Sequence, residues 1–99
     1  MASNFKMFVK HMKGGVHVKL KGDFDGTSGH QLAHILTESA KTAQRITIET
    51  DELRQIHSFG ASTFASHLRI ASNERVRLIF KGRHARKIAP GRRPSVRIE

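Results

Sequence analysis

The sequence predicts one α/β domain with a mixed sheet of about four strands, in the order β-β-α-β-α-β, and with helices mainly on one face of the sheet. Apolar and polar residues alternate at residues 16–21, 46–48 and 76–80, which is the period of a strand with one solvated face. Two stripes of apolar residues at helical spacing lie between these segments. The chain has 99 residues, which suits a single domain with one core.

An antiparallel hairpin is expected at the N-terminus. Residues 5–10 are a weaker strand candidate, and residues 16–21 are the clearest one. Between them, Gly14 and Gly15 supply the residues that a tight hairpin turn requires. The later strands follow helices, and a strand, helix, strand order within one sheet gives a parallel, right-handed crossover.

Two long helices are expected. The first covers residues 29–43, with Thr27 or Ser28 as its N-cap. The second covers residues 59–72, with Ser58 as its N-cap. Packed on the alternating strands, their apolar stripes predict a core that contains Leu20, Ile35, Leu36, Ile46, Ile48, Phe64, Leu68, Leu78 and Phe80.

Irregular structure is expected between the third strand and the second helix. The alternation of apolar and polar residues stops there, so residues 50–57 predict a loop that Leu53 and Ile56 anchor. Residues 83–88 predict one or two further helical turns near the C-terminus.

The positive charge is concentrated at the C-terminus. The formal net charge of the chain is +10, and seven Lys and Arg against one Glu give residues 81–99 a net charge of +6. Two prolines and a glycine interrupt regular structure at residues 90–94. The sequence therefore predicts a domain over residues 1–89 and a basic, flexible tail over residues 90–99, which attracts an acidic partner.

Several classes of protein are disfavoured. Cysteine is absent, which excludes disulfides, thiolate catalysis and cysteine-based zinc sites. No segment has the ~20 apolar residues of a membrane span, and no Gly-rich phosphate loop or nucleophile elbow is present. The six Phe fall mostly at core-facing positions, which leaves no stacking platform for nucleic acid beside the tail. We therefore expect a cytoplasmic protein that is not an enzyme and has no cofactor.

Candidate functional residues gather in the loops beyond the carboxyl ends of the predicted parallel strands. This rule places four polar residues at one end of the domain: Asp23, Asp25, Ser58 and Lys81. Ser58 has two interpretations. It is an N-cap, or it is an exposed hydroxyl that accepts a phosphate, which the helix dipole and free N–H groups then stabilise.

Two possible metal sites are weighed against simpler interpretations. Asp23 and Asp25 are either paired carboxylates able to hold Mg²⁺ or, as is commoner in such loops, turn and capping residues. His30 and His34 share a helix face, but no third ligand accompanies them, so solvated histidines are favoured. The sequence predicts no metal site.

Three short motifs in this order resemble the STAS family, the domains shared by sulphate transporters and anti-sigma-factor antagonists, over about residues 5–90. Gly-Asp-Phe-Asp at residues 22–25 looks like the family's G-E-L-D turn. Ile-Glu-Thr at residues 48–50, followed by a leucine, looks like its "l-D-l-s-g-v" segment, and Ile-His-Ser-Phe-Gly at residues 56–60 is similar to its "i-D-S-S-G" motif. The resemblance implies a STAS fold.

The resemblance also implies a phosphorylation switch. In stand-alone members, a partner serine kinase that is also the anti-sigma factor phosphorylates the first serine of D-S-S-G, which weakens partner binding, and a phosphatase restores it. By position, Ser58 matches that serine, Asp25 matches the turn's aspartate and Gly60 matches the motif's glycine. The chain departs from the motif at two positions, where His57 replaces the aspartate and Phe59 replaces the second serine or threonine.

The expected function is that of a bacterial regulatory module of the anti-sigma-factor antagonist type, whose partner is an anti-sigma-type serine kinase or a related regulatory protein. Ser58 is the candidate phosphoacceptor, and the candidate partner-binding residues are Asp23, Asp25, His57, Phe59 and Gly60. Two alternatives stay open. One is a non-phosphorylated STAS scaffold or accessory subunit with Phe59 as an exposed anchor, and the other is a nucleic-acid-binding module that uses residues 81–97.

Overall fold

The α/β class and the order of the first six elements are confirmed in the structure, a computed structural model that describes residues 4–68, 76–91 and 96–99. A short helix and a fifth strand follow. The elements are β1 (Lys6–Met12), β2 (Gly15–Phe24), α1 (Gly26–Ser39), β3 (Arg45–Ile56), α2 (Ser58–His67), β4 (Arg77–Lys81), α3 (Ala85–Ile88) and β5 (Val96–Ile98).

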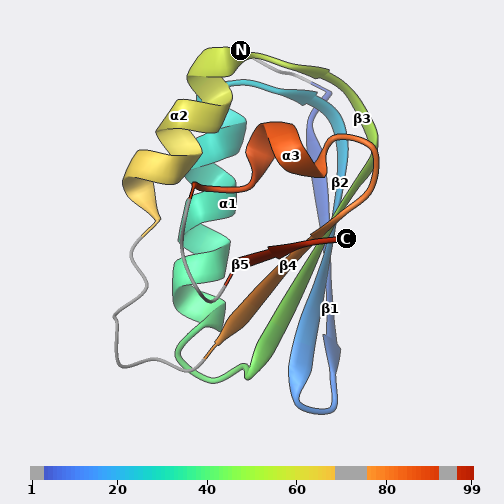
Figure 1. Ribbon diagram of the computed structural model, residues 1–99, viewed down its shortest axis with the longest axis vertical. Helices are drawn as coiled ribbons and strands as arrows, with labels where there is room; N and C mark the ends of the chain where they lie inside the picture. The colour runs from blue at the N-terminus through green and yellow to red at the C-terminus, as the bar shows by residue number, and fades with distance from the viewer. Residues whose placement is uncertain (1–3, 69–75, 92–95) are drawn as a thin grey trace.

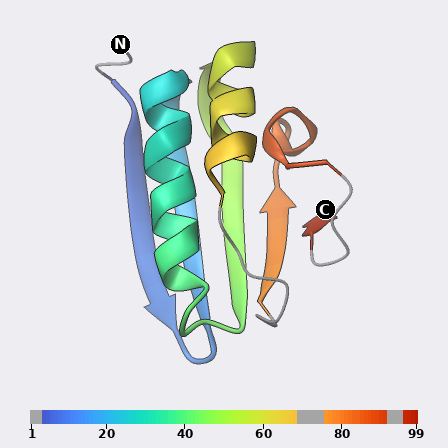
Figure 2. The same ribbon diagram turned by 90° about the vertical axis from the view of Figure 1, so that its left-hand side faces the viewer.

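The strands lie in the sheet in the same order as in the chain, β1-β2-β3-β4-β5. The hairpin strands β1 and β2 are antiparallel, and every later neighbour is parallel. Each parallel crossover therefore moves in the same direction across the sheet, and right-handed crossovers then place their helices on one face. Figure 1 shows α1, α2 and α3 on the same side of the sheet, and Figure 2 shows them from that side.

The predicted loop at residues 50–57 is wrong, because β3 continues to Ile56. Its pairing with β2 shifts register twice, between Lys19 and Lys21 and between Gly22 and Asp23. At each shift β3 uses one more residue than β2, as in a β-bulge, so the period of two is interrupted along the strand. The apolar–polar alternation stops after residue 49 because of these two register shifts, and not because the strand ends there.

Both long helices begin differently from the prediction. Asp25, and neither Thr27 nor Ser28, is the N-cap of α1, and its Oδ1 accepts a hydrogen bond from the Ser28 backbone N–H at 3.0 Å. Ser58 is the first residue of α2, whose N-cap is His57.

The second helix also ends earlier than predicted. The backbone of Leu68 is extended, with φ −72° and ψ 118°, and its side chain is buried in the core, so α2 stops at His67. The predicted continuation over residues 69–72 lies outside the described residues.

The predicted flexible tail is wrong at residues 96–99, which belong to the sheet. β5 pairs with β4 in parallel, and the Glu99 N–H donates to the Phe80 carbonyl at 2.9 Å. Val96 packs against the core, and Pro90 is buried. The outer edge of β4 offers unpaired backbone groups, and β5 satisfies them.

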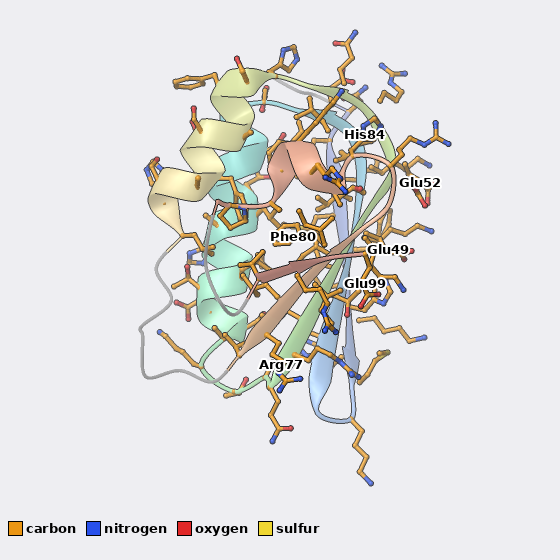
Figure 3. All side chains as sticks on the ribbon, in the orientation of Figure 1. Glu49, Glu52, Arg77, Phe80, His84 and Glu99 are labelled. Atoms are coloured by element: carbon orange, nitrogen blue, oxygen red, sulfur yellow. The ribbon has the colours of Figure 1, made fainter. Side chains whose placement is uncertain are left out.

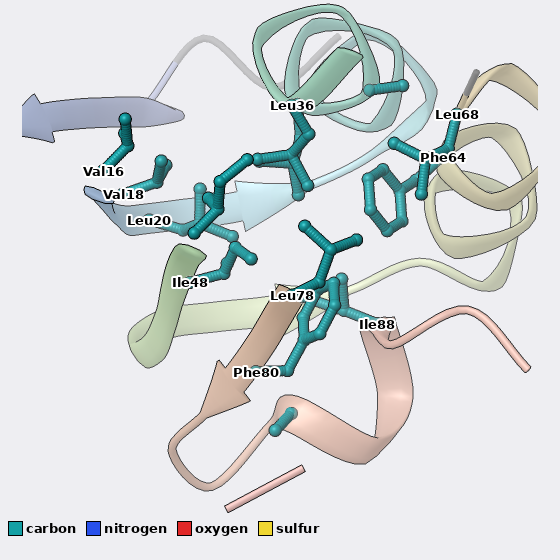
Figure 4. Close-up of a cluster of buried hydrophobic side chains, with 14 of the residues drawn as sticks. Val16, Val18, Leu20, Leu36, Ile48, Phe64, Leu68, Leu78, Phe80 and Ile88 are labelled. Carbon is teal, nitrogen blue, oxygen red and sulfur yellow. The ribbon is translucent and has the colours of Figure 1, made fainter. Parts of the chain in front are cut away.

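The core lies between the sheet and the helices (Figure 4). All nine residues predicted to be core contribute to it, with Ile35 only partly buried. The rings of Phe64 and Phe80 meet edge to face with centroids 6.0 Å apart, which joins α2 to β4. The prediction omitted Phe24, Leu32, Leu53 and Ile88, which are also buried.

Deletion of residues 96–99 is expected to lower the free energy of unfolding by about 1–3 kcal/mol, because it removes the β5 pairing and the partial burial of Val96. Urea denaturation of the truncated and full chains measures the difference. Arg97→Gln is the matched control, since it changes an exposed side chain and keeps the backbone pairing. An unchanged midpoint on truncation would show that β5 adds nothing to the fold.

Candidate functional site

The loops that follow β2 and β3 lie side by side at one end of the sheet. Phe24 and Ile56, the last residues of the two strands, are register partners. One residue further on, the His57 N–H donates to the Phe24 carbonyl at 2.9 Å. The structure therefore brings Asp25 and Ser58 to the same place, near the upper end of α1 and α2 in Figure 1.

Lys81 does not join them. It ends β4, but its register partner is Glu49, which lies seven positions before the end of β3. β3 has 12 residues and β4 has 5, so their carboxyl ends are far apart along the sheet. The chain after β4 instead brings α3 toward Ser58, and a groove of about 510 Å³ is lined by both Ser58 and Lys87.

Two glycines permit α2 to approach the β2–α1 junction. A Cβ on Gly60 would lie 2.7 Å from the Asp25 carbonyl oxygen and 2.8 Å from the Phe24 carbonyl oxygen. A Cβ on Gly29 of α1 would collide with the Gly60 carbonyl oxygen. Because both obstacles are backbone atoms, only glycine fits at either position.

Asp25 and Asp23 stabilise this junction in different ways. Asp25 Oδ1 accepts hydrogen bonds from the backbone N–H and the hydroxyl of Ser28, both at 3.0 Å. Asp23 Oδ1 lies 3.6 Å from Arg54 Nε, which is an ion pair too long to be a hydrogen bond. The capping interpretation of Asp25 therefore fits its contacts. Among the described residues, no group of three metal-ligating side chains occurs.

Ser58 is exposed at the start of α2. The N–H groups of Gly60 and Ala61 donate to the His57 carbonyl at 2.9 and 3.2 Å. Those of Ser58 and Phe59 have no hydrogen-bond partner within the described part of the chain, as is usual in the first turn of a helix. The hydroxyl is thus accessible and close to the positive end of the α2 dipole.

Phe59 presents an apolar ring beside Ser58. Its side chain is 72% exposed, and one edge of the ring lies against Gly26. The ring borders a groove of about 800 Å³ between α1 and α2, which Asp25, Thr63 and His67 also line. His57, the last of the predicted partner-binding residues, is exposed next to it.

His30 and His34 are exposed on α1, as the favoured interpretation of solvated histidines expected. His30 also meets His67 of α2, with ring centroids 4.8 Å apart. His67 was missed because only the packing of α1 on α2 brings the two rings together. The surface around them carries little formal charge, since Glu38 is the only Asp, Glu, Lys or Arg on α1 and α2 has none.

This arrangement of sheet and helices is the STAS fold, so the predicted fold is confirmed. The anti-sigma factor antagonist SpoIIAA in its unphosphorylated form superposes with a TM-score of 0.59 at 16% identity, over 78% of this chain and 71% of that chain. An anti-sigma factor antagonist from Mycobacterium paratuberculosis superposes with a TM-score of 0.60 at 14% identity, over 88% and 78%.

Sequence comparison detects no relationship of this kind. No family model matches the sequence, and no curated protein matches it. The low identities to the two solved structures agree with this, because the likeness lies in the arrangement of elements. Within the described residues, no helix is long and apolar enough to cross a membrane.

Proposed function

We propose that this protein is a bacterial regulatory module of the anti-sigma-factor antagonist type, in which phosphorylation of Ser58 controls the binding of a protein partner. The observation that carries the proposal is the exposed Ser58 at the start of α2, packed beside the β2–α1 junction. The two structural neighbours that share the fold are anti-sigma factor antagonists. The module is not an enzyme, acts in the cytoplasm on transcription, and its partner is an anti-sigma-type serine kinase or a related regulator.

The modification is an ordinary phosphoryl transfer from ATP. The Ser58 hydroxyl oxygen attacks the γ-phosphorus, its proton passes to a base of the kinase, and ADP leaves. The product carries about −1.5 to −2 charges at neutral pH. The free N–H groups of the first turn of α2 stabilise this charge, and Lys87 lines the same groove.

The phosphate weakens the binding of a partner that packs on the neighbouring apolar surface. Such a partner covers the exposed ring of Phe59 and the weakly charged groove between α1 and α2. With Ser58 phosphorylated, the same partner must remove water from a dianion next to that ring, and the N–H groups of the first turn of α2 and Lys87 offset this free-energy cost only in part. Binding then becomes weaker without any change in the fold.

A second candidate is a STAS scaffold or accessory subunit that is not phosphorylated. The 72% exposure of Phe59 favours it, because an aromatic ring held on a glycine is a suitable anchor for a permanent partner. The two candidates share a docking surface and differ only in the role of Ser58.

Phosphorylation and partner capture from a native bacterial lysate test the proposal. With ATP present, we expect mass spectrometry to find phosphate on Ser58 and none in Ser58→Ala. Ser58→Asp should reduce partner capture at least about tenfold. Thr42→Asp is the matched control, because it adds the same charge to an exposed hydroxyl residue beyond the C-terminal end of α1, away from Ser58 and Phe59, and should leave capture unchanged.

The outcomes separate the candidates. Phosphate on another residue, or equal capture by Ser58→Asp and the wild type, contradicts the switch. If Phe59→Ala abolishes capture while Ser58→Asp does not, the scaffold function is the correct one.

A further inference from the structure

The face of the sheet that the helices leave uncovered is strongly basic. Residues directly paired between neighbouring strands share a face, and β1 pairs with β2 as Lys6 with Lys21, Phe8 with Lys19 and Lys10 with His17. All of these positions lie opposite the buried set that includes Val18 and Leu20. We call this surface the open sheet face.

The other three strands extend the same charge. Arg45 of β3 pairs with Arg77 of β4, Glu49 with Lys81, and Ile79 with Arg97 of β5. In Figure 3, Glu49 and Glu52 point away from the helices, while Phe80 points toward the core. The open sheet face therefore holds eight Lys and Arg against four carboxylates, Asp23, Glu49, Glu52 and Glu99.

All four carboxylates already have a basic neighbour: Asp23 Oδ1 lies 3.6 Å from Arg54 Nε, and Glu99 Oε2 lies 4.0 Å from Arg97 Nη1. His17 Nε2 lies 2.7 Å from Glu49 Oε2, and Lys19 Nζ lies 2.6 Å from Glu52 Oε2. The hydrogen bond from Lys19, and then its charge, lower the pKa of Glu52, and the pKa of Lys19 is raised in turn. Each carboxylate thus has a nearer basic partner than the remaining cations of the face.

Six cations of the open sheet face have no ion pair within the described part of the chain: Lys6, Lys10, Lys21, Arg45, Arg77 and Lys81. Two pairs of them, Lys6 with Lys21 and Arg45 with Arg77, are direct cross-strand neighbours. Like charges opposite one another destabilise a sheet. An extended anion that lies over the face removes this repulsion. The nearly uncharged α1–α2 surface has no cations that could bind such an anion.

We propose that the open sheet face binds single-stranded nucleic acid, with the lysines and arginines contacting phosphates and Phe8 stacking on a base. Phe8 is 52% exposed on β1, two positions from both Lys6 and Lys10 and paired with Lys19. A stacking ring inside a field of cations is the combination that sequence-tolerant binding of single strands uses. The sequence analysis assigned the excess positive charge to the C-terminus and most of the Phe rings to the core.

The shape of the face favours a single strand over a duplex or a membrane. Five strands about 4.8 Å apart span about 19 Å, which is wider than the roughly 12 Å major groove of B-DNA. Stable membrane attachment needs an apolar surface that enters the lipid, whereas here most of the exposed side chains are charged. A single strand lies across the face and reaches both the phosphate-binding cations and the ring.

The proposal can be tested by fluorescence anisotropy with the full chain and a labelled oligo(dT) of about 20 nucleotides. Affinity is measured at salt concentrations from about 50 to about 300 mM, because the salt dependence reports the release of counterions from the phosphates. If the six unpaired cations each neutralise one phosphate, log K falls with log salt with a slope of about −4, from roughly 0.7 per phosphate. Phe8→Ala should weaken binding about 5- to 150-fold, the loss of one stacked base.

Charge variants locate the surface. Lys6→Gln with Lys10→Gln should weaken binding and make the salt slope shallower by about 1.4. Arg86→Gln with Lys87→Gln is the matched control, because it removes the same charge from exposed residues of α3 and should change neither quantity. Circular dichroism checks that each variant keeps the fold, and Ser58→Asp should bind the oligonucleotide as the wild type does.

Three results would overturn the proposal. One is no anisotropy change at 50 mM salt with a large excess of protein. Another is an equal loss of affinity in the α3 control pair, since the binding is then not on the open sheet face. The third is binding to vesicles that contain phosphatidylserine without binding to the oligonucleotide, which would assign the face to anionic lipid.

Discussion

Replacement of Phe64 by alanine is expected to lower the free energy of unfolding by about 3–5 kcal/mol, which is a large part of the roughly 5–15 kcal/mol that holds a domain of this size together. The side chain is completely buried, and its ring packs on Phe80 across the interface between α2 and β4. Alanine leaves a cavity there, and Gly29 behind it has no side chain that could move to fill the space.

Phe59→Ala is the matched control for this change. It is the same substitution five positions earlier in the same helix, but it removes a ring that is 72% exposed, so the expected loss is below about 1 kcal/mol. Urea denaturation of both variants measures the difference, and Phe64→Leu should recover most of the stability. Equal losses in Phe59→Ala and Phe64→Ala would show that the inner face of α2 is misplaced.

Gly60→Ala is expected to cost about 1–3 kcal/mol, even though alanine is up to ~1 kcal/mol better than glycine within a helix. The added methyl group meets the backbone carbonyls of Phe24 and Asp25, which cannot rotate away as a side chain can. To fit it, α2 has to move off the β2–α1 junction, and Phe59 then loses its contact with Gly26.

Gly91→Ala is the control that separates the clash of the added methyl group from the change in backbone flexibility that any Gly→Ala substitution causes. A Cβ at Gly91 meets nothing within 4 Å, so this variant should unfold at or slightly above the wild-type midpoint. Thermal and urea denaturation of both variants give the comparison. A Gly60→Ala protein as stable as the wild type would mean that α2 and the β2–α1 junction have room between them, contrary to the distances described above.

Much of the fold could be predicted because the signals are local. Alternation at Val16, Val18 and Leu20 reports one buried face, and the structure buries all three. The failures arise where local patterns break. The two register shifts in β3 hide a long strand from a period-of-two search, and β5 has only three residues, too few to show a period at all.

The candidate site shows the same division. The strand-end rule brought Asp25 and Ser58 together correctly as neighbours in space, because β2 and β3 end side by side. It failed for Lys81, because β4 is much shorter than β3. The open sheet face was missed because its cations come from five strands, and a count along the chain finds only those near the C-terminus.

The strict neighbour order of the sheet also determines how the chain can fold as it is synthesised. Each strand pairs with the one made just before it, so no strand has to wait for a later one or be inserted between two that are already paired. At typical rates of about 5–20 residues per second, a chain of this length takes on the order of 5–20 s to emerge. β1 and β2 can form their hairpin first, each crossover then adds one helix and one strand, and β5 closes the outer edge last. β5 is therefore the last strand that the sheet receives.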